Sequence, residues 1–216
     1  MIKIIDIKAR EIFDSRGNPT VECEMLVEGH PDPFFGLVPS GASTGKFEAL
    51  ELRDNDNQRM SGKGVLKAVD NINTSMKPHL INTSFNDYKD FDNSILSLDG
   101  TDNKSKYGAN AILSLSLAFY KAWSYINYNK IYLSQGSNDL SIPVPMLNII
   151  NGGQHADNDV DFQEFMILPI NFGNLKEALS ASHDVISKIK KNLKSKNHNT
   201  NVGDEGGFAP NLKSHI

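Results

Sequence analysis

The fold of the first part of the chain is decided by Asp14-Ser15-Arg16-Gly17-Asn18-Pro19. This stretch is rich in turn-forming residues and separates two segments, 3–8 and 20–28, whose β-branched and alternating residues are typical of strands. Because the connection is short, the two segments are predicted to pair as an antiparallel unit. Residues 34–39 are predicted to form a third short strand that ends at Pro39.

Helices are expected to follow the strands, over residues 62–78, 86–98 and 107–126. Apolar residues recur in these segments at the spacing of one helix face. The first helix is expected to close at Pro78, because proline cannot continue a helix interior. Strands followed by helices predict an α+β domain with an antiparallel sheet.

The pattern changes at Ser141-Ile142-Pro143-Val144-Pro145, which we interpret as a domain boundary or a strand entry. The elements expected beyond it are two strands, a helix and a further short strand, over residues 146–150, 162–169, 174–194 and 200–203. These units indicate the first elements of an incomplete α/β barrel of the TIM type, since a full barrel takes about 250 residues. The expected domains are therefore residues 1–140 and 141–216.

Composition excludes several classes of protein. The 216 residues are 39% hydrophobic with a formal net charge of -4, which argues against a general binder of nucleic acid or anionic membranes. No apolar run approaches the roughly 18 residues of a membrane span, and the N-terminus lacks a signal peptide. Cys23 is the single cysteine, which excludes a disulfide framework, and we expect it to be a small buried residue. A cytoplasmic protein is expected, with secretion or surface display without a signal peptide left open.

Two loops offer residues suited to binding. Ser40–Gly45 combines two glycines with three hydroxyls, so its backbone can approach an anion and its hydroxyls can face a metal ion; a mobile surface turn is the alternative. In the loop 151–159, two glycines precede His155 and are expected to leave the imidazole exposed. His155 can then act as an acid, an anion donor or a metal ligand. The alternative is a loop histidine stabilised by a neighbouring aspartate.

Two further positions offer carboxylates. Glu164 lies in a predicted strand among Phe, Met and Ile, where a carboxylate is costly unless it is paired or has a raised pKa. A structural Glu paired with a lysine is the alternative. The loop 203–210 places Asp204 and Glu205 side by side between glycines, so one can anchor the loop while the other points into a site. Glu164 and Glu205 can thus cooperate as an acid–base pair, unless Asp204 and Glu205 form a plain acidic turn.

Together these motifs resemble, in order and spacing, those of enolase, the glycolytic lyase that dehydrates 2-phospho-D-glycerate to phosphoenolpyruvate. The runs that carry the resemblance are Asp14–Thr20, Ser40–Gly45, Leu98–Thr101, Asn103–Ser105, Gly108–Ala111, Asn148–Phe165 and Gly203–Asn211. The resemblance covers the whole chain, is bacterial in its details, and corresponds to the N-terminal half of an enolase.

The resemblance implies a role for each matched residue. Ser43 would supply oxygen ligands to the second of two Mg²⁺ ions when its loop closes over substrate. His155 would contact the phosphate side of the substrate, and Gln163 would touch bound substrate. Glu164 would support departure of the 3-hydroxyl, and Glu205 would donate the proton to the leaving hydroxide, which is a poor leaving group until it is protonated.

The resemblance also implies a homodimer for the full-length form. In enolases the carboxylates that hold the first magnesium ion, the lysine base and the basic residues that bind phosphate all lie later than the end of this chain. We therefore expect the isolated chain to have no appreciable dehydratase activity. The alternative is a non-catalytic, truncated remnant that acts at most as an interaction or dimerisation module.

Overall fold

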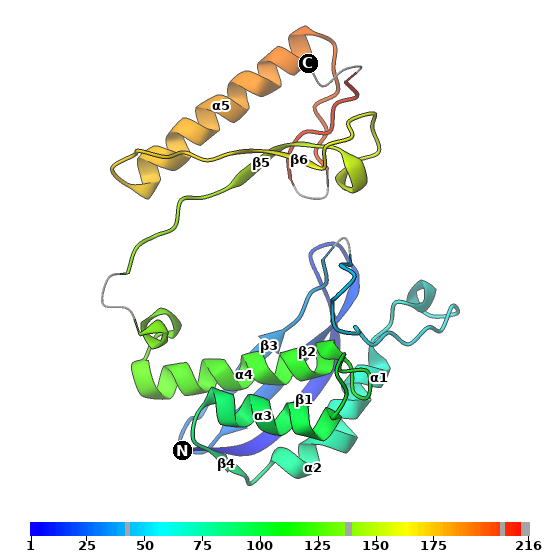
Figure 1. The fold of residues 1–216 in the computed structure, drawn as a ribbon, viewed down its shortest axis with the longest axis vertical. Helices are drawn as coiled ribbons and strands as arrows, with labels where there is room; N and C mark the ends of the chain where they lie inside the picture. The colour runs from blue at the N-terminus through cyan, green and yellow to red at the C-terminus, as the bar shows by residue number, and fades with distance from the viewer. Residues whose placement is uncertain (42–43, 137–139, 204–205, 213–216) are drawn as a thin grey trace. The chain divides into compact units, whose positions relative to one another are not determined.

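The computed structural model describes residues 1–41, 44–136, 140–203 and 206–212. The chain divides into two compact units, Met1–Ser137 and Asn138–Ile216, and each is described by itself (Figure 1). Across the described ranges, no helix has both the length and the apolar character that crossing a membrane requires.

The first unit is built on a four-stranded antiparallel sheet. Its strands are β1 (Ile2–Phe13), β2 (Pro19–Val27), β3 (Phe34–Leu37) and β4 (Ser84–Phe85), in the spatial order β3-β2-β1-β4. The turn between β1 and β2 is closed by Asp14, whose Oδ1 accepts from the backbone N–H of Arg16 (2.9 Å) and of Asn18 (2.8 Å). This confirms the predicted antiparallel pairing, with β1 longer than the expected segment.

Helices α1 (Leu66–Asp70), α2 (Lys77–Leu80), α3 (Tyr88–Asp99) and α4 (Ala109–Tyr128) follow, with a π-helical turn between α1 and α2. The expectation that a helix closes at Pro78 is wrong. Pro78 is the second residue of α2 and follows directly on the π-helical turn Asn71–Met76, so its missing N–H falls where the regular helical hydrogen-bond pattern is already interrupted. The segment therefore continues to Leu80, and the single helix expected over residues 62–78 is divided into three parts.

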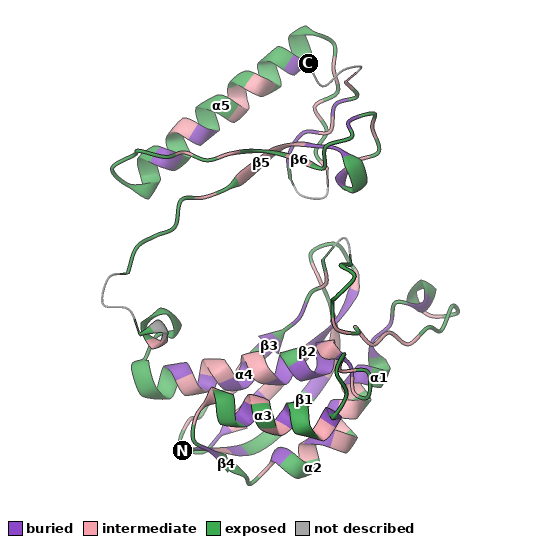
Figure 2. Cartoon of the chain, in the orientation of Figure 1, coloured by how far each residue is buried: buried purple, intermediate pink, exposed green. Residues whose placement is uncertain are grey.

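The core of this unit lies between the sheet and the helices, which cover one face of the sheet (Figure 1). Buried residues occur both on the strands and on the helices that cover them, as Figure 2 shows. Phe91 of α3 and Phe119 of α4 stack with ring centroids 4.3 Å apart. Cys23 is fully buried in β2, as predicted, and burial raises the pKa of its thiol to about 12, so the thiol is not reactive.

The second unit contains two paired strands and one long helix. Strands β5 (Leu147–Asn151) and β6 (Glu164–Ile167) are antiparallel, and α5 (Leu175–Ser195) is capped by Asn174, whose side chain accepts from Glu177 N. The expected strand at 200–203 is reduced to one bridge between Val202 and Phe208. An α+β domain followed by elements of an incomplete barrel is thus the fold of this chain.

Candidate functional site

The candidate site in the second unit is the end of the β5–β6 pair, where the register places Asn151 opposite Glu164. The loop between the two strands contains a short 3-10 helix, Gly153–His155. This topology brings His155 and Gln163 to the same end of the strand pair as Glu164, although they are distant along the loop. Three residues that the sequence singled out therefore meet in one place.

His155 is held between two of these residues. Its Nε2 lies 2.8 Å from Gln163 Nε2, and its Nδ1 lies 3.1 Å from Glu164 Oε1. The contact at Nδ1 is within ion-pair distance but is not aligned as a hydrogen bond. Among the described residues, Nδ1 has no hydrogen-bond partner. Because a carboxylate only accepts, the neutral ring favours a proton on Nδ1, and Nε2 then accepts from the Gln163 amide.

The prediction of an exposed imidazole is wrong, because the side chain of His155 is only 7% exposed. Its partner also differs from the aspartate of the structural alternative, since the contact is to Glu164. The alternative of a structural Glu164 paired with a lysine is also wrong, because the described ion pair of Glu164 is with a histidine. A buried imidazole in contact with a half-buried carboxylate is a suitable pair for acid–base chemistry.

The two glycines before His155 are required by close backbone packing. A Cβ atom at Gly152 would lie 2.4 Å from the carbonyl oxygens of both Val160 and Phe162, and Gly153 has a φ of +52°. The backbone N–H of Gly153 donates to Val160 O at 2.7 Å. The loop therefore folds tightly onto its own returning strand, and this turns the imidazole inward.

The segment after α5 packs against the same strand end. The backbone N–H of Phe208 donates to Ile149 O (2.9 Å), and that of Asn151 donates to Phe208 O (2.8 Å), which makes a parallel bridge to β5. A Cβ at Gly203 would lie 2.7 Å from His155 O, so this glycine is in direct contact with the histidine loop. Asp204 and Glu205 lie outside the described residues, between Gly203 and Gly206.

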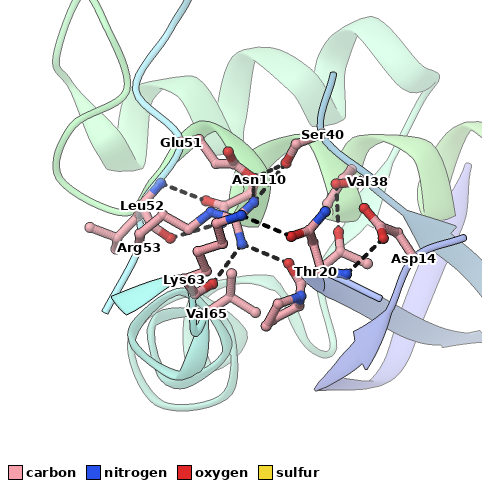
Figure 3. A network of polar contacts seen from close by, with 12 residues as sticks. Asp14, Thr20, Val38, Ser40, Glu51, Leu52, Arg53, Lys63, Val65 and Asn110 are labelled. Carbon is pink, nitrogen blue, oxygen red and sulfur yellow. Dashed lines mark hydrogen bonds and ion pairs between the residues drawn. The ribbon is translucent and has the colours of Figure 1, made fainter. Parts of the chain in front are cut away.

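The other predicted loop lies in the first unit, and its Ser43 also falls outside the described residues. The start of this loop is held by Arg53, as Figure 3 shows. Arg53 Nη2 donates to Ser40 Oγ (2.8 Å) and to Glu51 Oε1 (2.6 Å), and Ser40 Oγ also donates to Glu51. Arg53 Nη1 donates to the carbonyls of Pro19 (2.6 Å) and Lys63 (2.7 Å). The loop thus leaves β3 from a fixed point.

A pocket of about 400 Å³ lies beside this fixed point. It is bounded by residues on both sides of the loop and by the first residues of α4; the polar lining residues are Ser40, Thr44, Glu48, Glu51 and Asn110. Asn110 bonds both backbone groups of Leu52, donating to its oxygen at 3.0 Å and accepting from its nitrogen at 3.1 Å. The pocket wall is therefore rigid on the α4 side.

The described residues do not fit a magnesium ion by themselves. Mg²⁺ requires near-octahedral oxygen coordination, usually with carboxylates and water. Within the described ranges, no group of three or more His, Cys, Asp or Glu side chains is placed to hold a metal ion. His155 and Glu164 offer one imidazole and one carboxylate, which is not such a set.

Sequence reasoning missed two polar residues, the buried Asn151 and the half-buried Arg53. Asn151 is fully buried at the end of β5, and Arg53 makes four hydrogen bonds beside Ser40. The available signal for Asn151 was an amide directly after the apolar pair Ile149 and Ile150, a position where an apolar residue is expected in a core strand.

Two family models match this sequence. Residues 4–134 match the model described as Enolase, N-terminal domain. Residues 139–216 match the model described as Enolase, C-terminal TIM barrel domain. The matches cover both units of the structure and nearly every residue of the chain.

Proposed function

The chain belongs to the enolase family, and from this premise we propose that it serves the dehydration of 2-phospho-D-glycerate to phosphoenolpyruvate. The observation that carries the proposal is the meeting of His155, Gln163 and Glu164 at one strand end, with Gly203 packed on the His155 carbonyl. Those side chains supply a buried imidazole, an amide and a carboxylate within contact of one another. A phosphorylated hydroxy acid offers matching acceptor and donor groups.

In this proposal the chain supplies the general acid, which protonates the departing hydroxyl group. After a proton has left C2 of the substrate, the bond from C3 to its hydroxyl oxygen breaks, and the departing oxygen takes a proton from Glu205 to leave as water. Glu164 supports this departure, and His155 and Gln163 bind the substrate. Deprotonated Glu205 is then restored by a proton from solvent.

The proposal also includes the metal ions and the lysine base that the family uses. Enolases use two Mg²⁺ ions to stabilise the negative charge formed at the carboxylate, and Ser43 would ligate the second of them. The lysine base and the carboxylates of the first ion are not among the motifs matched in these 216 residues. We expect the 216-residue polypeptide alone to be inactive, and we place the activity in the cytoplasm and in a homodimer of the full-length form.

The test is a coupled assay of phosphoenolpyruvate formation from 2-phosphoglycerate with Mg²⁺. The chain is assayed alone and mixed with a separate polypeptide that carries the rest of an enolase barrel. We expect turnover only in the mixture, and its loss on Glu205→Gln, because a neutral amide cannot donate the proton. Glu28→Gln, at an exposed ion pair with Lys3, is the matched control and keeps full turnover.

Two outcomes would contradict the proposal. Near-normal turnover by the chain alone would show that these residues contain a complete site. A folded mixture without turnover would favour the non-catalytic alternative, in which the chain acts as an interaction or dimerisation module. Sedimentation of the chain at increasing concentration would then test that alternative directly.

A further inference from the structure

We propose that Asn151 is the positioning residue of this site: it fixes the two described ends of the segment 203–208, Gly203 and residues 206–208, against the end of β5, beside His155. The inference rests on the proposed function, because that function gives the segment its proton donor. Asn151 has no contact with the reacting groups in this proposal. It acts through the backbone of the segment on either side of Glu205.

Asn151 has no exposed surface, and its side-chain and backbone nitrogen and oxygen atoms each make a hydrogen bond within the protein. Its side-chain Nδ2 donates to Gly207 O at 2.6 Å, and its Oδ1 accepts from Asn148 Nδ2 at 2.6 Å. Its backbone N–H donates to Phe208 O at 2.8 Å, and its carbonyl accepts from Asn158 Nδ2 at 2.9 Å. A buried amide with all its groups paired specifies one arrangement of the groups around it.

The segment is shaped to receive this amide. A Cβ at Gly207 would lie 2.9 Å from Asn151 Nδ2, and a Cβ at Gly203 would lie 3.0 Å from the same atom. Any larger residue at either position would therefore push the segment off the amide. Gly203 N also donates to Gly207 O at 2.9 Å, so the carbonyl that Asn151 binds closes the turn.

Asn158 braces the same contact from the histidine loop. Its Nδ2 donates to Asn151 O (2.9 Å) and to Pro210 O (3.0 Å), while its Oδ1 accepts from Val160 N (3.1 Å). Asn158 thus bonds the loop of His155 both to Asn151 and to Pro210. Because catalytic groups must be held to within a fraction of an ångström, a residue that ties both loops together sets their relative position.

The variant Asn151→Asp tests the inference, because aspartate has nearly the same shape and replaces the Nδ2 donor with an oxygen that faces Gly207 O. Amide hydrogen exchange of the 216-residue chain is the first readout. We expect exchange at Gly203 and Phe208 to become about tenfold faster or more, since a paired donor is lost at the point that closes the turn. The amide of Gly152, which donates to Gln163 O, should keep its rate.

Asn199→Asp is the matched control, since it makes the same change at an exposed asparagine of the same unit, whose described side-chain bond, accepted from Asn201 N (2.7 Å), aspartate can keep. It should leave exchange at Phe208 within about twofold of the wild type. Gly207→Ala is the second variant, in case Asn151→Asp fails to fold. It keeps the amide and displaces the segment, so it should also accelerate exchange at Phe208.

Turnover in the mixture with the remaining barrel is the second readout. Asn151→Asp should lower kcat about 100-fold with KM within about threefold, the effect of a misplaced donor with substrate contacts intact. If wild-type turnover is absent, the proposed function fails while the exchange experiment still decides the inference. Unchanged exchange at Gly203 and Phe208 in both variants, or a rise in KM with unchanged kcat in an active mixture, would overturn it.

Discussion

Gly36 of β3 and Ser114 of α4 bring a strand and a helix into backbone contact. A Cβ atom at Gly36 would lie 1.9 Å from the carbonyl oxygen of Ser114 and 2.9 Å from the nitrogen of Ala118. No side chain fits between the two backbones, so α4 lies directly on the strand. Since β3 leads into Ser40, this contact also fixes the strand from which the Ser40–Gly45 loop departs.

We expect Gly36→Ala to lower the free energy of unfolding of the first unit by about 3 kcal/mol, because α4 must move away from β3 to admit a methyl group. Urea denaturation followed by circular dichroism measures the loss. Gly29→Ala is the control, since its Cβ would meet open space and only its φ of +80° opposes the change, at about 1 kcal/mol. Equal losses in the two variants would contradict direct backbone contact.

The ion pair of Glu11 with Arg59 predicts acid sensitivity in the same unit. A hydrogen bond from Arg59, with another from Val65 N (2.8 Å), holds the pKa of Glu11 below its ordinary value of 4.5 against the opposing effect of burial. A carboxyl group with a lowered folded-state pKa stabilises the fold above its unfolded pKa and loses that effect as pH falls through the folded pKa.

We therefore expect Glu11→Gln to be less stable than the wild type by about 2 kcal/mol at neutral pH, with the difference shrinking below pH 4.5. Denaturation midpoints measured across the acid range give the comparison. Glu28→Gln, whose carboxylate is 64% exposed beside Lys3, should change stability by less than about 0.5 kcal/mol. A Glu11→Gln deficit that stays constant in acid would argue against this origin.

The contact between His155 and Glu164 predicts a single imidazole tautomer. Nitrogen NMR at neutral pH should find the proton of the neutral ring on Nδ1, and Glu164→Ala should give a mixture, because the carboxylate favours that form. The matched pair is His183 with Asp184, at 3.7 Å and largely exposed. Asp184→Ala should leave the tautomers of His183 unchanged; a proton on Nε2 of His155 in the wild type would contradict the assignment.

Removal of Arg53 should loosen the start of the Ser40–Gly45 loop. Arg53→Met deletes the donors to Ser40 Oγ and to Pro19 O, so trypsin should cut after the exposed Lys46 several-fold faster, as local opening becomes easier. Mass spectrometry of the released N-terminal fragment measures the rate. Arg10→Met, which removes ion pairs with Glu22 and Glu24, is the control; the same acceleration there would indicate general unfolding.

Local patterns were sufficient for most elements of the first unit. The turn around Asp14 and the alternation in β2 predict the antiparallel pair, because strand period and turn chemistry are properties of neighbouring residues. The burial of Cys23 follows from the same alternation. The continuation of the helix past Pro78 could not be predicted in this way, because proline is normally excluded from a helix interior and is accepted here directly after a π-helical turn.

The candidate site could likewise be predicted from the sequence only in part. His155, Gln163 and Glu164 could be singled out from residue type and the glycines beside them, but their mutual contact depends on how the loop folds back onto β6. Asn151 and Arg53 escaped notice because each binds a backbone carbonyl that is distant in the chain, Gly207 O for Asn151 and Pro19 O for Arg53. A carbonyl is present at every residue, so no sequence pattern marks the one that is bound.

The family, the order of strands and helices, and the chemical groups available to the site all follow from residue type and spacing. The burial of His155 in contact with Glu164 and the bond from Asn151 to Gly207 O follow only from how the chain packs. The physical reason is that desolvation and long-range hydrogen bonds depend on which distant backbone groups surround a side chain, and that is settled when the chain packs.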